Sequence, residues 1–177
     1  MGLRRQTLNL SLNNSDCSKP VMRLEIVSRS EAQTAALARG VAKLLRPGDV
    51  VFLTGPLGAG KTFFVRHAAF ALGVLGPVTS PSFTMAQTYE GEVRVHHLDL
   101  YRLSGFTAED VVDFEPFFEG DAITFIEWPE QAESFLTGPA LTIRLDHVDL
   151  DSRRISLESR NQEMNQGLEQ LLAGTGD

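Results

Sequence analysis

The segment Gly55-Pro56-Leu57-Gly58-Ala59-Gly60-Lys61-Thr62 constrains this chain more than any other. It matches the phosphate-binding loop pattern G-x-x-x-x-G-K-[ST], which requires a strand before it and a helix after it. The apolar run 50–53 predicts that strand, and the helical spacing of apolar residues across 63–72 predicts that helix. The segment therefore predicts a binding site for a nucleoside triphosphate.

The chemistry of phosphate binding explains the residue types in this segment. Glycines let successive backbone N–H groups turn towards an anion, and the helix that starts at about Gly60 adds its unpaired N–H groups and its dipole. Lys61 would reach the terminal phosphates as a point charge, and the Thr62 hydroxyl would ligate Mg²⁺. The candidate ATP-binding residues of the loop are Gly55, Leu57, Gly58, Ala59, Gly60, Lys61 and Thr62, and Lys61 is also a catalytic candidate.

Length and charge restrict the possible partners. The chain has 177 residues and fits one domain with a real core. Its 16 Lys and Arg are outnumbered by 23 acidic residues, which gives a formal charge of −7 and argues against extended contact with nucleic acid by this chain alone. Cys17 is the single cysteine, so no disulfide framework is expected, and the composition suits a cytoplasmic protein without a membrane span.

The order of predicted elements indicates the fold class. We expect strands at 24–27, 50–53, 122–126, 141–145 and 154–157, a hairpin formed by 85–89 and 92–97, and helices at 30–45, 63–72, 109–112, 130–136 and 162–172. These predict a three-layer α/β domain of the P-loop NTPase type, with a mixed, mainly parallel sheet and antiparallel additions. The predicted division is a disordered leader (1–22), a P-loop ATPase domain (23–160) and a C-terminal helix and tail (161–177).

Two acidic residues follow predicted strands and are candidates for the Mg²⁺ and catalytic chemistry. A phosphate loop needs a carboxylate at the end of a neighbouring strand to complete the Mg²⁺ shell. Glu127 follows the more apolar strand, so we expect it beside the Mg²⁺ bound by Thr62. Asp99 follows His96 and His97, a more polar setting that suits an acid orienting water or sensing the γ-phosphate. A metal cluster at the two histidines is the weaker interpretation.

Trp128 is the only tryptophan and directly follows Glu127. The side chain could pack near a nucleotide or simply fill the core. The core interpretation is favoured, because a large aromatic ring is usually buried.

Four motifs in this order resemble the bacterial TsaE (YjeE-type) ATPases, over roughly residues 24–157. They are Gly55 to Thr62, Thr79-Ser80-Pro81-Ser82-Phe83-Thr84, His97-Leu98-Asp99-Leu100-Tyr101-Arg102-Leu103 and Glu127-Trp128-Pro129-Glu130. One departure is Phe63, where many members of that family have a small polar residue.

The resemblance implies roles for the matching positions. Lys61 would bind the β- and γ-phosphates, Thr62 and Glu127 would hold Mg²⁺, and Asp99 would be the essential acid. Residues 79–84 would form a switch loop over the phosphates, with Thr79, Ser80 and Thr84 as its candidate residues. Glu31 and Glu130 would contribute to ATP binding.

The same resemblance implies a weak, Mg²⁺-dependent ATPase that is stimulated by its partner subunits. The family serves as an accessory of the complex that forms N6-threonylcarbamoyladenosine next to the tRNA anticodon, at position 37. The implied partner is a heterodimer of the threonylcarbamoyl-transferase subunit and its inactive paralogue, with tRNA held only through these partners. A small-molecule P-loop kinase is the alternative, although no Arg-rich lid is evident, and a pure binding module is a third possibility.

Overall fold

The computed structural model describes residues 21–103, 113–118, 120–132, 136 and 138–174. Seven strands form one sheet in the order β1-β7-β6-β2-β5-β4-β3. The strands are β1 (Met22–Ser28), β2 (Val50–Thr54), β3 (Ala86–Tyr89), β4 (Arg94–Asp99), β5 (Ala122–Glu127), β6 (Leu141–His147) and β7 (Arg153–Ser159). Strands β6, β2, β5 and β4 are mutually parallel, while β1, β7 and β3 are added through antiparallel pairs. The predicted mixed α/β fold is confirmed.

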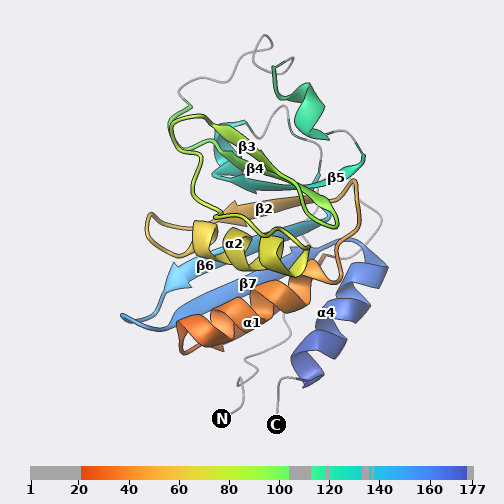
Figure 1. Ribbon diagram of the computed structural model, residues 1–177. Coiled ribbons are helices and arrows are strands. Elements are labelled where there is room, and N and C mark those ends of the chain that lie inside the picture. The colour runs from red at the N-terminus through yellow and green to blue at the C-terminus, as the bar shows by residue number, and fades with distance from the viewer. Residues whose placement is uncertain (1–20, 104–112, 119, 133–135, 137, 175–177) are drawn as a thin grey trace.

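The three α-helices of the described residues pack on one face of the sheet and share its main hydrophobic core (Figure 1). They are α1 (Glu31–Ala42), α2 (Lys61–Ala71) and α4 (Gln162–Gly174). On the opposite face a smaller cluster around Leu98, Phe114 and Ile126 lies over the β2–β5–β4 part of the sheet. The short 3₁₀ helices η1 (Glu115–Phe118) and η2 (Pro129–Gln131) lie at this part of the sheet. The third layer is therefore small in the described residues.

Local sequence explains where α1 begins. The Ser30 hydroxyl accepts a hydrogen bond from the backbone N–H of Gln33 (3.3 Å), and the Gln33 side chain accepts from the backbone N–H of Arg29 (2.8 Å). This reciprocal pattern satisfies two N–H groups at the helix start. Ser30 is the N-cap, whereas the hydroxyl of the nearby Ser28 bonds that of Thr34 (2.8 Å).

Most predicted elements occur within one to three residues of their expected bounds, with two exceptions. The helix expected at 130–136 is described only at its start, as the 3₁₀ turn η2 that Pro129 begins, because residues 133–135 lie outside the described residues. The helix expected at 109–112 lies outside the described residues.

Two predicted domain boundaries differ from the observed packing. Met22, assigned by sequence to the leader, is the first residue of β1 and pairs with Ser159. Helix α4, assigned beyond the domain, contributes Met164, Leu168 and Leu172 to the main core. The division into leader, domain and tail otherwise stays a prediction. No described helix combines the length and the apolar character needed to cross a bilayer.

Parallel pairing places the ends of three strands together. In the register, Leu53 of β2 is opposite Glu127 of β5, and Glu127 is opposite Asp99 of β4. Because alternate residues of a strand face the same side, Glu127, Asp99 and His97 share the face that α2 covers. The sheet thus presents two acids beside the loop that follows β2.

We predict that Phe64→Ala lowers the free energy of unfolding by about 3–5 kcal/mol, the usual cost of truncating a fully buried aromatic side chain. Phe64 is completely buried in α2, under the sheet. The matched control is Phe70→Ala in the same helix, where the side chain is 45% exposed and the expected cost is below about 1 kcal/mol. Urea denaturation of both variants measures the difference, and equal losses would contradict the packing of α2.

Candidate functional site

The loop between β2 and α2 has the backbone shape that its glycines predict. Gly55, Gly58 and Gly60 have φ values of 123°, 76° and 105°, in the left-handed region that side chains disfavour. At Gly55 the restriction is also steric, because a Cβ there would collide with the carbonyl oxygen of Leu145 in β6. Helix α2 begins at Lys61, with Gly60 as its N-cap.

The ammonium group of Lys61 lies inside the curve of this loop. It donates to the carbonyl oxygens of Gly55 (2.8 Å) and Pro56 (3.1 Å), and it lies 3.8 Å from the centre of the Trp128 ring. Burial lowers the pKa of Lys61, while the charges of Glu127, Asp99 and Glu130 act in the opposite direction. The lysine is thus a partly desolvated cation held between an aromatic face and two strand-end acids.

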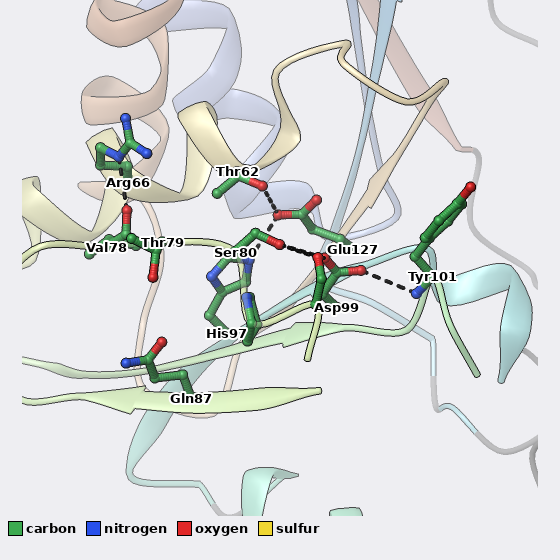
Figure 2. Close-up of polar contacts among 12 residues, drawn as sticks. Thr62, Arg66, Val78, Thr79, Ser80, Gln87, His97, Asp99, Tyr101 and Glu127 are labelled. Carbon is green, nitrogen blue, oxygen red and sulfur yellow. Dashed lines mark hydrogen bonds and ion pairs between the residues drawn. The ribbon is translucent and has the colours of Figure 1, made fainter. Parts of the chain in front are cut away.

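Glu127 connects β5 with the start of α2 (Figure 2). Its Oε1 atom accepts hydrogen bonds from the Thr62 hydroxyl (2.7 Å) and from Nε2 of His97 (2.9 Å). Because an ionised carboxylate only accepts, the proton of the second bond belongs to Nε2. The other ring nitrogen, Nδ1, is buried and has no hydrogen-bond partner among the described residues. His97 therefore fixes the orientation of the carboxylate that faces Thr62.

Asp99 is bonded to the predicted switch loop. Its Oδ2 accepts from the hydroxyls of Ser80 (2.7 Å) and Ser82 (2.6 Å), and its Oδ1 accepts from the backbone N–H of Tyr101 (3.1 Å). Figure 2 shows the Ser80 hydroxyl directed at this carboxylate. Asp99 and Glu127 are neighbours in the sheet, yet they bind different segments of the chain.

Both ends of the switch loop are also tied to the fold. At the start, Arg66 of α2 donates to the carbonyl oxygen of Val78 (2.9 Å), and the Tyr89 hydroxyl bonds the backbone of Thr79 (3.1 and 3.3 Å). At the far end, the backbone N–H of Asp99 donates to the carbonyl oxygen of Met85 (2.9 Å). The loop is a strap whose middle is held by the Asp99 carboxylate, by the Arg102 guanidinium 4.4 Å from the centre of the Phe83 ring, and by local contacts.

These groups surround a cavity of about 300 Å³. It is lined by Leu57, Gly58, Gly60, Lys61, Thr62, Ser80, Ser82, Asp99, Tyr101, Glu127 and Trp128. The remaining candidate residues from the sequence lie outside this lining: Glu31, Gly55, Ala59, Thr79, Thr84 and Glu130. Of these, Glu31 is exposed in the first turn of α1. The roles predicted for all of them stay predictions.

The sequence favoured a core position for Trp128, but in the structure the side chain does not simply fill the core. It is half-buried, lines the cavity, and packs against the Tyr101 ring with 4.9 Å between ring centres. Its φ of 59° is unusual for a bulky residue and turns the chain from β5 into η2. The Trp128 side chain also packs against the smaller hydrophobic cluster around Leu98, Phe114 and Ile126. It therefore contributes to that cluster and forms a wall of the cavity.

Sequence reasoning missed Ser82 and Tyr101 as site residues. Both belong to motifs that were identified, so their residue types were visible, but only the folded loop shows that they reach the cavity. The two adjacent histidines face opposite sides of the sheet, with His96 bonded to Thr88 (2.9 Å) and packed edge-on against Phe117. They therefore do not converge on one point.

Comparison with known proteins identifies the family. The model of the family described as threonylcarbamoyl adenosine biosynthesis protein TsaE matches residues 28–155, which spans all four motifs. The chain belongs to the TsaE family.

Curated TsaE proteins and a solved structure are similar to this chain over most of its length. The protein named tRNA threonylcarbamoyladenosine biosynthesis protein TsaE in Treponema pallidum is 38% identical over 136 residues, which cover 76% of this chain and 99% of that protein. The TsaE protein of Rickettsia conorii is 37% identical over 139 residues, 77% and 79% of the two chains. The crystal structure of Bacillus subtilis YdiB superposes with a TM-score of 0.72 at 29% identity, covering 87% of this chain and 97% of that one.

We predict that Asp99→Ala releases the middle of the switch loop. Two serine hydroxyls and one backbone N–H lose an acceptor, and hydrogen bonds to a charged group contribute about 1.5–3 kcal/mol each. Amide hydrogen exchange across 79–85 should accelerate by at least about ten-fold, measured by mass spectrometry. Glu90→Ala is the control, because it removes an exposed carboxylate that pairs only with Arg94 (3.1 Å) among the described residues. Equal exchange in both variants would contradict the strap.

Proposed function

We propose that this TsaE-family chain is a Mg²⁺-dependent ATP-binding protein with weak ATPase activity that takes part in forming threonylcarbamoyladenosine in tRNA. The observation that carries the proposal is the Thr62–Glu127 hydrogen bond of 2.7 Å beside the Lys61 ammonium, at the mouth of a glycine loop. A hydroxyl at the start of a helix, a strand-end carboxylate and a lysine are the three side chains that a P-loop site uses. The names of the relatives support the biological role.

The residues present fit Mg²⁺. This ion prefers hard oxygen ligands and keeps several of its waters, so one hydroxyl and one carboxylate beside the phosphates are a sufficient protein contribution. Thr62 and Glu127 would hold it, directly or through water. Bound there, Mg²⁺ would neutralise charge that develops on the phosphates during transfer.

Lys61 would be the main cationic contact to the phosphates. An ammonium group has three donors, and two of them bond loop carbonyls here. The third is available, and lowered hydration of the buried group strengthens its attraction to an anion. Trp128 closes one side of the cavity and restricts where the ammonium can move.

Asp99 would link the γ-phosphate to the switch loop. Two roles are consistent with its position, orienting the attacking water or sensing the γ-phosphate. The bonds to Ser80 and Ser82 support the second role, because any ligand that competes for those hydroxyls also changes the loop. Hydrolysis would then be coupled to the shape of residues 79–84.

We further propose that partner subunits complete the activity. The formal charge of −7 favours a chain that meets tRNA only through other proteins. The partner that the family resemblance implies is the heterodimer of the threonylcarbamoyl-transferase subunit and its inactive paralogue. Work on tRNA would place the protein in the cytoplasm.

We predict that the single tryptophan reports nucleotide binding. Trp128 is the only tryptophan and lies 3.8 Å from the Lys61 ammonium, so Mg-ATP should change its fluorescence emission. Lys61→Ala should weaken Mg-ATP binding by on the order of 10–100-fold, since it removes a charged hydrogen bond of about 1.5–3 kcal/mol. Calorimetry gives the affinities independently of the ring. Unchanged ATP affinity in Lys61→Ala would refute the site.

We also predict that a Mg²⁺ titration of the ATPase rate, with partner subunits present, distinguishes the role of Asp99 from that of Glu127. Asp99→Asn should leave ATP affinity within a few-fold and lose on the order of 10² in turnover, because its role is realised in the transition state. Glu127→Gln should raise the Mg²⁺ concentration needed for half-maximal rate. If only Asp99→Asn shifts the Mg²⁺ requirement, the roles are reversed.

A further inference from the structure

The outer side of the phosphate loop lies against the hairpin formed by β6 and β7. Gly55 packs on the carbonyl of Leu145, and Nε2 of His147 lies 3.4 Å from the carbonyl oxygen of Leu57. The closest polar contact is from Arg153, whose Nε donates to the carbonyl oxygen of Ala59 at 3.1 Å. The loop is thus bounded by the cavity on one side and by this hairpin on the other.

Arg153 also binds the turn of its own hairpin. Its Nη1 atom contacts the carbonyl oxygens of Asp149 (3.1 Å), Leu150 (3.1 Å) and Ser152 (3.0 Å). One planar guanidinium therefore joins the hairpin turn to a loop residue 94 positions earlier in the sequence. Its planar fork presents Nε to the loop and Nη1 to the turn at the same time, in a fixed relation to each other.

The direction of the Ala59 carbonyl determines the direction of the next amide. In a planar trans peptide the C=O and the following N–H point to opposite sides. With the Ala59 carbonyl turned outwards to Arg153, the Gly60 N–H is turned inwards, where Gly60 lines the cavity. Gly60 has φ of 105° and no side chain to resist a flip of this peptide, so an external contact must fix it.

We propose that Arg153 is a positioning residue that holds the Ala59–Gly60 peptide with its N–H facing the cavity, so that the loop is preformed for an anion. The inference rests on the proposed nucleotide binding at this loop. A loop that populates the competent shape only part of the time binds with an affinity reduced by that fraction. Arg153 raises the fraction of molecules whose loop has the binding-competent conformation, without touching the ligand.

The matched pair of variants is Arg153→Gln and Arg154→Gln. The two arginines are neighbours in β7, but Arg154 is exposed and pairs with Glu25 (3.3 Å) rather than with the loop. Arg153→Gln should raise the Kd of Mg-ATP by on the order of ten-fold by calorimetry, while Arg154→Gln stays within two-fold. Turnover at saturating ATP should change by less than about three-fold in both, because bound phosphates themselves order the loop.

A readout without ligand separates positioning from general stability. In the nitrogen-15 spectrum of the free protein, the Gly60 amide signal should shift or broaden in Arg153→Gln and not in Arg154→Gln. If Arg153→Gln fails to fold, Arg153→Lys replaces it. That variant keeps the charge but lacks the planar pair of Nε and Nη1 that holds the loop and the turn in a fixed relation, so its Kd should also rise.

The outcomes distinguish this inference from the function on which it rests. A wild-type chain that binds no Mg-ATP overturns the proposed function and this inference with it. A wild-type chain that binds, with an unchanged Kd in Arg153→Gln or an equal loss in Arg154→Gln, overturns only the role of Arg153. A fall in turnover with an unchanged Kd would also overturn it.

Discussion

The parallel pairing of β2, β5 and β4 is the constraint on which the site depends. It sets Leu53 opposite Glu127 and Glu127 opposite Asp99, so the glycine loop 55–62 and both acids emerge at the same edge of the sheet. Residues 99 and 127 are far apart in sequence, and no local preference would bring them together. A slip of one residue in either pair would turn an acid to the opposite face, away from α2. The contacts described above for Thr62, Lys61 and His97 all lie near this edge of the sheet.

The site concentrates features that cost stability. A partly desolvated lysine lies beside an aromatic ring, and His97 keeps one buried ring nitrogen without a partner among the described residues. The two non-glycine residues with positive φ in the described chain are Met85 and Trp128. Trp128 lines the cavity, and Met85 ends the strap, where its carbonyl oxygen accepts from the Asp99 N–H. Such conformations persist only where surrounding structure enforces them, and they gather at functional sites.

Much of the fold could be predicted because its signals are local. Apolar runs such as 122–126 indicate strands buried on both faces, and Ser30 marks the start of α1 through its own hydrogen bond. Helix α4 was recognised, but its place in the main core was not, because an amphipathic helix does not specify its partner. The helix expected at 130–136 can be compared only at its start, the 3₁₀ turn η2, because residues 133–135 lie outside the described residues.

The sequence by itself determined the glycine loop 55–62 and the identity of the two acids at the strand ends. The loop has the residue types and spacing of the phosphate-binding loop pattern, in which glycines allow the backbone to curl and a lysine supplies the charge. The residues concerned are Gly55, Gly58, Gly60, Lys61 and Thr62. The sequence also predicted that Glu127 lies beside Thr62, as the structure has it. Only the tertiary structure decided that Ser82 and Trp128 reach the cavity and that Arg153 holds the Ala59 carbonyl. The physical reason is separation along the sequence. Local patterns determine the backbone dihedral angles and which face of a strand is buried. Strand register and loop packing instead bring together residues that are tens of positions apart.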